Sequence, residues 1–185
     1  PILRTMIPID RDSGYRAAVD QFRGKVENIQ DALRKNGVIL GVQNHCGDFV
    51  GTSLGIVEVI SALDTNYVKA VLDLGHTALA GEPTPYAIEI AWPHLAMVNL
   101  KNAHWVAAGR NSDGEQTWRR QWVGAKDGLA SWREIISTLK AHQFQGPLCL
   151  TAEYRNDEDE VLKGEEVNPL IQDDGRYAHS LITET

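Results

Sequence analysis

The chain has 185 residues, of which 43% are hydrophobic and 23% are charged, so it can form one globular domain with its own core. Its net charge of −7 would repel nucleic acids and anionic membrane surfaces. We therefore expect no nucleic-acid partner. We expect no membrane partner either, since no apolar run approaches the roughly 18 residues that span a bilayer.

In chain order, short apolar runs alternate with longer segments of helical spacing. The pattern predicts strand 2–9, helix 15–35, strand 38–42, helix 52–63, strand 68–74, helix 85–92, strand 96–100, helix 131–142, strand 148–152 and helix 165–182. Strands that alternate with helices are typical of parallel βαβ units. We therefore predict an α/β fold, with residues 1–185 forming a single domain.

Two helix ends carry local signals. The helix over 15–35 places Ala18, Phe22, Val26, Ile29 and Leu33 on one stripe, and the Asn-Gly pair at 36–37 predicts its end. Ser131 is the expected N-cap of the helix over 131–142.

Residues 107–128 form a stretch rich in glycine, tryptophan and arginine that is too long for a simple connector. Long loops in compact domains are usually functional or mobile. Trp105, Trp118 and Trp122 surround this stretch and predict either a sugar-stacking wall or packing that fixes the loop. Arg119 and Arg120 are weaker candidates for binding a phosphate or a carboxylate.

Polar residues collect where the predicted strands end, and in parallel α/β folds these ends form the active-site edge. They are Gln43, Asn44, His45, Asp73, His76, Asn99, Lys101, Asn102 and Glu153. Because side chains alternate along a strand, Gln43 shares a face with His45, and Asn99 shares one with Lys101. Gln43, His45 and Lys101 are candidates for substrate binding.

The same alternation lets two carboxylates and two amides converge on one point. Asp73, Glu153, Asn99 and Gln43 would give an oxygen-rich site that suits Mg²⁺ or Mn²⁺. His76 lies three residues beyond Asp73, where it can bind either the metal or a substrate hydroxyl.

Four segments resemble the xylose isomerase-like TIM barrel superfamily of sugar phosphate isomerases and epimerases. They are VILGVQNHCG, VLDLGHTALAG, HLAMVNLKNAHW and GPLCLTAEYR. The resemblance implies a (β/α)8 barrel of which this chain covers about the carboxy-terminal two thirds. We expect the missing amino-terminal units, roughly 90 residues at about 30 per unit, to belong to a longer polypeptide or to a partner chain.

The resemblance also implies a site. Family members bind a divalent metal through Glu, Asp, His and Glu, and they use the two Glu residues to move a proton. By position, Asp73 matches the metal-binding Asp, His76 the His that contacts the substrate, and Glu153 the final Glu, with Thr151 as the alternative register. Glu153 and His76 are the predicted catalytic residues.

Two positions depart from the family pattern. Gln43 stands where the first Glu is expected, and Asn99 where the His ligand is expected. An amide cannot act as a general base near neutral pH. We therefore predict a divalent metal (Mn, Mg or Zn) that is weakly bound or absent.

These features favour a metal-assisted isomerase or epimerase that removes a proton next to a carbonyl of a sugar derivative. The alternatives are a lyase or hydrolase with one base (Glu153, His45 or His76) and a non-catalytic sugar-binding subunit. An apurinic-site endonuclease, which shares the superfamily fold, is disfavoured because no His-rich zinc cluster or basic surface is visible. A homo-oligomer is compatible with the sequence.

Cellular location is predicted from the cysteines and the first residues. Cys46 and Cys149 are too few for a disulfide framework, so we expect two reduced thiols in or near the core. The first 15 residues lack the pattern of a signal peptide. Both observations favour a cytoplasmic protein, with a cleaved export signal as the alternative.

Overall fold

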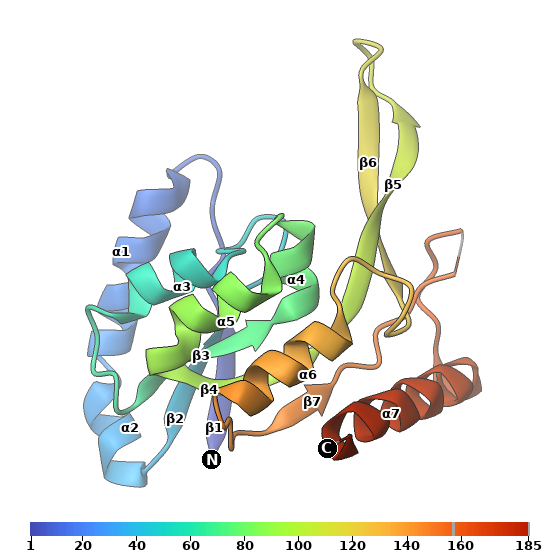
Figure 1. Ribbon diagram of the computed structural model, residues 1–185. Helices are drawn as coiled ribbons and strands as arrows, with labels where there is room; N and C mark the ends of the chain where they lie inside the picture. Colours follow the sequence, from blue (N-terminus) through green and yellow to red (C-terminus); the bar gives the residue numbers. More distant parts are fainter. Residues whose placement is uncertain (157, 185) are drawn as a thin grey trace.

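Five parallel strands form the centre of the protein in a computed structural model that describes residues 1–156 and 158–184 (Figure 1). The strands are β1 (Ile2–Met6), β2 (Ile39–Gln43), β3 (Val68–Asp73), β4 (Leu95–Leu100) and β7 (Leu148–Leu150). They lie side by side in chain order, so each connection returns to the neighbouring position in the sheet. This confirms the predicted parallel βαβ organisation.

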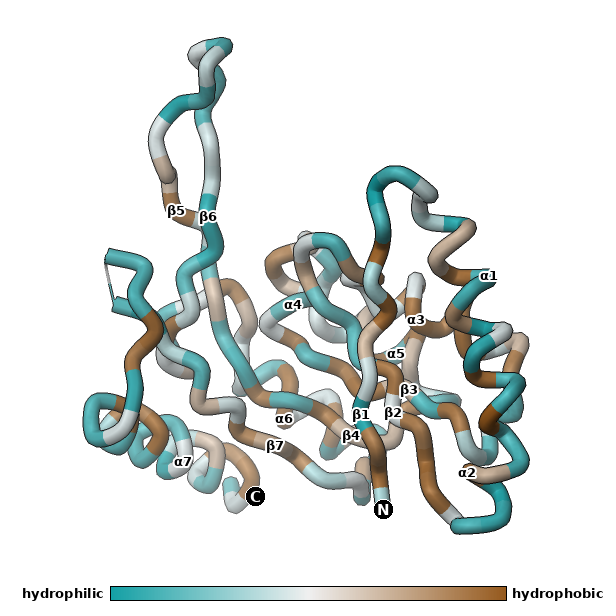
Figure 2. The backbone as a smooth tube through the Cα atoms, turned by 180° about the vertical axis from the view of Figure 1, so that it is seen from behind, coloured by the Kyte–Doolittle hydropathy of each residue, from teal (hydrophilic) through white to brown (hydrophobic). Residues whose placement is uncertain are grey.

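The helices cover one face of this sheet. They are α1 (Gly14–Glu27), α2 (Gln30–Asn36), α3 (Ser53–Ile60), α4 (Leu74–Leu79), α5 (Thr84–Ala91), α6 (Trp132–Ala141) and α7 (Val167–Thr183), with short 3-10 helices η1 (Trp92–His94) and η2 (Gly164–Glu166). Most of them lie in front of the sheet in Figure 1, whereas strands face the viewer in the reverse view of Figure 2. The core lies between the two layers and includes the fully buried Ile56, Ile88 and Ile135.

The single helix predicted over 15–35 is wrong, because the chain forms two helices there. Between α1 and α2 the Ile29 N–H bonds the Val26 carbonyl three residues back, which tightens the turn. The apolar stripe therefore shifts phase. Val26 and Leu33 stay buried while Ile29 is exposed, so the α2 packing differs from that of one continuous helix.

The predicted helix signals at the other ends are confirmed. Gly37 has φ +60°, a left-handed conformation that favours glycine, and it ends α2. Ser131 accepts a hydrogen bond from the Glu134 N–H and caps α6. Thr52 caps α3 in the same way through the Gly55 N–H.

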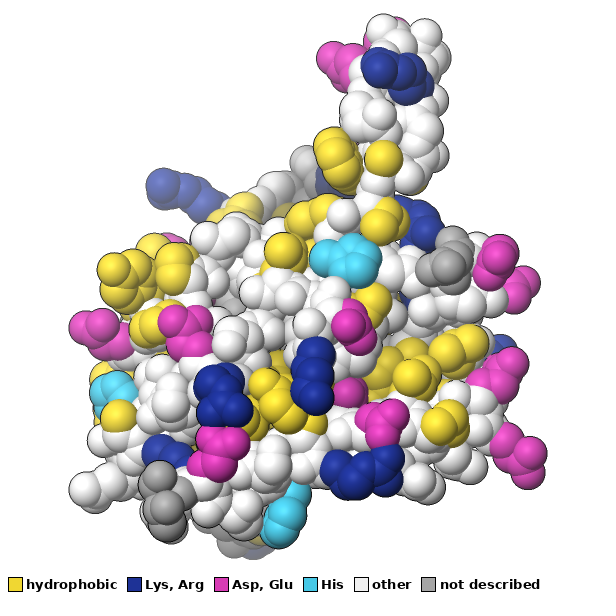
Figure 3. Space-filling model, turned by 45° about the vertical axis from the view of Figure 1, so that its right-hand side comes forward, with side chains coloured by type: hydrophobic (Ala, Val, Ile, Leu, Met, Phe, Trp, Pro, Cys, Tyr) yellow, Lys and Arg dark blue, Asp and Glu magenta, His cyan; other side chains and the backbone are white. Residues whose placement is uncertain are grey.

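Most of the stretch predicted as a long loop is a β-hairpin. Strand β5 (Asn102–Arg110) pairs antiparallel with β6 (Gln116–Val123), and the tip stands clear of the body in Figure 3. The hairpin was not predicted because polar residues occupy both faces of its outer half, which hides the alternation of a half-buried strand. At its base Trp122 is buried, whereas 61% of Trp118 is exposed.

Both cysteines are free thiols, as predicted. None of the helices within the described residues combines the length and apolar character that crossing a bilayer would require.

Candidate functional site

Three of the predicted site residues meet at the carboxyl ends of neighbouring strands. Asp73 ends β3 directly opposite Asn99 of β4, and Gln43 ends β2 on the other side of β3. The Gln43 amide nitrogen lies 3.4 Å from a carboxylate oxygen of Asp73 and donates to it. The shared register of parallel strands places these side chains together.

Asp73 is buried, with 1% of its surface exposed. Its other carboxylate oxygen accepts the His76 N–H at 3.3 Å, so Asp73 is also the N-cap of α4. The residues directly after β3, for which the sequence predicted no helix, thus form the first turn of α4. Burial raises the pKa of Asp73 to about 6, although the nearby Lys101 charge opposes this rise.

This burial leads to a pH-dependent prediction. We expect Asp73→Asn to stabilise the fold at about pH 8 and to change it little at about pH 4, because between its ordinary pKa of 3.8 and its folded value of about 6 only the unfolded chain loses the proton. The free energy of unfolding of the wild-type protein therefore decreases as the pH rises through this window, by roughly 3 kcal/mol at most. Urea unfolding of the wild-type and Asp73→Asn proteins at the two pH values measures this difference in stability. The same difference at both pH values would contradict the prediction.

Lys101 and Glu153 form an ion pair beside this carboxylate. The Lys101 ammonium contacts a Glu153 carboxylate oxygen directly. Only 3% of the Lys101 side chain is exposed, whereas 59% of Glu153 is exposed. The ammonium also lies 3.7 Å from the centroid of the Trp122 ring, where the aromatic face stabilises a cation.

The two histidines lie against each other, and one of them contacts the same tryptophan. The rings of His45 and His76 are 4.1 Å apart, and the His76 ring lies 5.0 Å from Trp122 in an edge-on arrangement. Burial lowers the pKa of His76 to about 2, with a contribution from Lys101, so His76 is neutral. Burial also lowers the pKa of the half-buried His45.

Hydrogen bonds to Cys46 determine where each histidine carries its proton. The Cys46 N–H donates to His76 Nδ1 at 3.2 Å, so the proton of this neutral ring is on Nε2. His76 Nε2 is buried and has no hydrogen-bond partner among the described residues, and it lies 3.7 Å from an Asp73 oxygen. His45 Nδ1 donates to the Cys46 carbonyl at 2.7 Å, which leaves its Nε2 as an acceptor.

Two residues shape the site in ways that sequence reasoning did not predict: Asn44 was placed at a strand end but given no role, and Arg4 was not singled out. The fully buried Asn44 accepts the Asp73 N–H at 2.8 Å and donates to the Asp73 carbonyl at 2.9 Å, which ties the ends of β2 and β3 together. Arg4 of β1 donates to the Asn99 side-chain oxygen at 3.3 Å. The alternation within residues 2–9 could have placed Arg4 on this face, but no local signal identifies the partners of Asn44.

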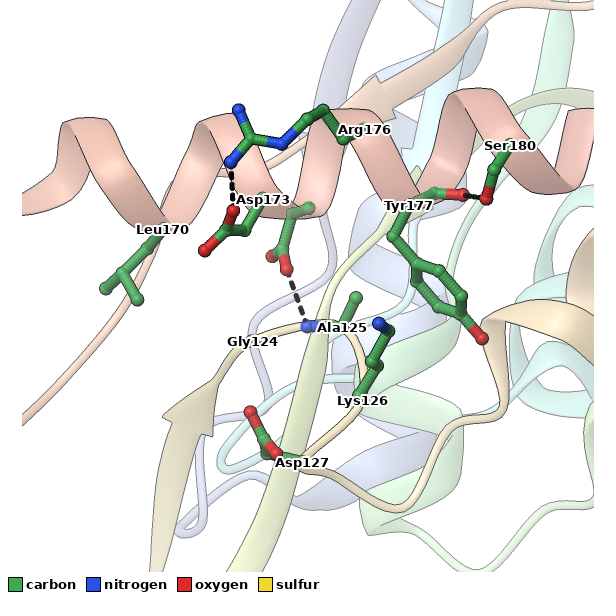
Figure 4. Close-up of a pocket in the computed structure, with 10 residues that line it drawn as sticks. Gly124, Ala125, Lys126, Asp127, Leu170, Asp173, Arg176, Tyr177 and Ser180 are labelled. Carbon is green, nitrogen blue, oxygen red and sulfur yellow. Dashed lines mark hydrogen bonds and ion pairs between the residues drawn. The ribbon is translucent and has the colours of Figure 1, made fainter.

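A separate hollow of about 570 Å³ lies between α7 and the loop after β6 (Figure 4). Its buried Asp174 accepts hydrogen bonds from the Ala125 N–H and the Tyr154 hydroxyl, both at 2.8 Å. On its rim Arg176 pairs with Asp173. These charged groups are paired with one another, and the predicted site residues lie elsewhere. We therefore assign the contacts of Asp174 a structural role, which is to hold α7 against the loop after β6.

The family model for xylose isomerase-like TIM barrels matches residues 2–173. The chain belongs to this family. Its fold is accordingly TIM-barrel-like, with the five parallel strands forming half of a barrel. A search of curated protein sequences gives no match.

Several solved structures of the xylose isomerase-like barrel share the fold. A barrel protein from Mycobacterium smegmatis in complex with magnesium is 18% identical, with a TM-score of 0.66, over 98% of this chain and 60% of its own. D-Psicose 3-epimerase from Clostridium cellulolyticum is 14% identical, with a TM-score of 0.69, and the match covers 98% of this chain and 64% of the epimerase. A probable 3-DHS dehydratase from Bacillus anthracis is 14% identical, with a TM-score of 0.67, and the match covers 96% of this chain and 63% of the dehydratase. This chain therefore spans less than two thirds of their length.

The family and the magnesium complex raise the question of a divalent metal. Among the described residues, His45, Cys46 and His76 are close enough to hold an ion, with candidate ligand atoms within 4.8 Å of one another. The set predicted from the sequence does not fit one as arranged. Gln43 presents an N–H to Asp73 rather than an oxygen to a shared point, and Glu153 contacts Lys101 instead of facing a common centre.

Proposed function

We propose that this chain carries the strand-end site of an enzyme that removes a proton next to a carbonyl of a sugar or sugar derivative. The observation that supports this most is the contact between the buried Lys101 ammonium and the exposed Glu153 carboxylate. It places a potential base and a fixed positive charge side by side. Similar folds include sugar epimerases, which agrees with the proposal.

In this proposal Glu153 takes the proton from carbon, because its carboxylate is accessible to a ligand. The negative charge then moves to the carbonyl oxygen, where the Lys101 ammonium stabilises it without reorganisation. The His76 N–H binds an oxygen of the substrate, while Gln43 and His45 bind its hydroxyl groups. Return of the proton from Glu153 to the neighbouring carbon gives an isomer, whereas delivery of a proton from water to the opposite face of the same carbon gives an epimer.

The metal assistance predicted from the sequence has no part in this scheme, since the predicted ligands do not fit an ion as arranged. A divalent metal at this strand-end edge would polarise the carbonyl oxygen when bound. Here the Lys101 ammonium supplies that charge. The cytoplasmic location and the homo-oligomeric state stay predictions.

A one-base elimination is the second candidate. Gln43 donates to Asp73 and cannot serve as a second acid–base group for epimerisation. Glu153 alone would suffice to remove a proton and expel a hydroxyl as water. The fold similarity to a probable dehydratase agrees with this alternative.

Deuterium exchange tests the proposal and separates the two reactions. We expect deuterium from heavy water to enter a keto sugar or sugar derivative at the carbon next to its carbonyl, as measured by NMR. In epimerisation or isomerisation the product has the mass of the substrate plus the incorporated deuterium, whereas in elimination the product is lighter by one water. No exchange in any member of a panel of keto sugars and acidic sugar derivatives would refute the proposal.

A further inference from the structure

Two N–H groups contact the Asp73 carboxylate, one at each oxygen. Its two oxygens accept from the Gln43 amide at 3.4 Å and from the His76 backbone N–H at 3.3 Å. On the next strand Asn99 lies directly opposite Asp73, and its buried amide nitrogen has no hydrogen-bond partner among the described residues. These donors partly satisfy the carboxylate in the way that a bound cation would.

The other oxygen atoms of the predicted metal set face cationic side chains. The Asn99 oxygen accepts from the Arg4 guanidinium at 3.3 Å, and the Glu153 carboxylate contacts the Lys101 ammonium. A divalent ion at this point would have to displace these cations or stand beside them, and like charges repel most strongly at a buried position. Two members of the predicted set, Asn99 and Glu153, are therefore already engaged by cationic side chains from outside the set.

His76 also presents a proton instead of a lone pair to the strand-end site. The Cys46 N–H occupies Nδ1 at 3.2 Å, so Nε2 carries the hydrogen and can donate but cannot ligate a metal. This buried Nε2–H has no acceptor within hydrogen-bonding distance among the described residues. An oxygen of a ligand would satisfy it.

We infer that this strand-end site binds the oxygen atoms of its ligand through the Lys101 ammonium and the His76 Nε2–H, and that it binds no divalent cation. The inference deepens the proposed function, on which it rests for the identity of the ligand, because it names the donors that replace the metal. The metal-free part does not depend on catalysis. It follows from the amides of Gln43 and Asn99, which stand where the family pattern expects an anionic and an imidazole ligand.

The His45, Cys46 and His76 group is the competing cation site. Zinc binding there needs the Cys46 thiolate, but Cys46 is a buried thiol and burial disfavours the charged form. It also needs the His76 proton to leave Nε2, although the Cys46 N–H prevents Nδ1 from taking it. The Lys101 and Arg120 charges disfavour a cation further, because both lie over the Trp122 ring that His76 contacts.

Metal titration tests the inference without an activity assay. Wild-type protein, purified without chelator and dialysed against metal-free buffer, is analysed by mass spectrometry for Mg, Mn, Fe and Zn and then titrated calorimetrically with Mn²⁺ and with Zn²⁺. We expect far less than one ion per chain and no saturable heat. The Gln43→Glu/Asn99→His double variant restores the expected ligands, and we expect it to gain one saturable Mn²⁺ site. Circular dichroism and thermal unfolding check that it folds, and the Gln43→Glu single variant serves if it does not.

Three results would overturn the inference. The first is a wild-type Mn²⁺ or Mg²⁺ site that Asp73→Ala removes. The second is a wild-type Zn²⁺ site that Cys46→Ser removes. The third is a folded ligand-restoring variant that still binds no Mn²⁺, which would show that the amides are not what excludes the cation. An absence of deuterium exchange would refute the proposed function but would leave these titrations unchanged, so the two failures are distinguishable.

Discussion

Replacing Glu153 with glutamine is expected to lower the rate of deuterium exchange by at least about 100-fold, the scale on which general-base catalysis contributes. The amide keeps the size of the side chain and its contact with Lys101 but cannot accept the proton. Because the Glu153 side chain is largely exposed, the substitution leaves the core intact and isolates the chemical effect. Wild-type and variant rates are compared by NMR in heavy water with the same substrate.

Two control variants make this result specific. Glu165→Gln removes an equally negative, exposed carboxylate in η2, which contributes no residue to the strand-end site, and should leave the exchange rate unchanged. Glu153→Asp keeps the carboxylate but shortens its reach, so it should retain part of the rate. A Glu153→Gln protein that exchanges at the wild-type rate would exclude Glu153 as the base and turn attention to the histidines.

Replacing Asn102 with alanine is expected to cost about 3 kcal/mol of stability or more, because it leaves several buried backbone groups unpaired. The Asn102 amide nitrogen donates to the Ala125 and Ala130 carbonyls, both at 2.8 Å. Its oxygen accepts the Ala103 N–H at 3.0 Å and the Ala130 N–H at 2.9 Å. Asn102 thus fixes the loop that returns from the hairpin to α6.

For a protein of this size such a loss corresponds to a decrease in Tm of roughly 6–12 °C, which thermal unfolding measures. Gly128→Ala should have a similar effect, since an added Cβ would lie 2.6 Å from the Ala103 nitrogen and collide with the Asn102 amide. Asn168→Ala on the exposed surface of α7 is the matched control and should change Tm little. Equal Tm values for Asn102→Ala and Asn168→Ala would contradict this role.

Much of the candidate site could be located from strand periodicity alone. Gln43, Asp73 and Asn99 each end a parallel strand, and such ends share one edge of a sheet whatever the exact register. Their roles stay proposals, but their proximity follows from alternation along the strands and from the chain order of the sheet. The hydrogen bonds of Asn44 could not be predicted in this way, because its partners lie in β3 and in the loop before α3.

The sequence by itself determined the alternation of strands and helices, most helix ends and the polar strand ends, because these depend on spacing and capping within a few residues. Only the tertiary structure decided the hairpin, the break between α1 and α2, and the pairing of Lys101 with Glu153, which lie 52 residues apart. It also decided that His76 carries its proton on Nε2, since a backbone N–H from another loop occupies Nδ1. Such contacts depend on how distant segments pack against each other, and no local pattern encodes that arrangement.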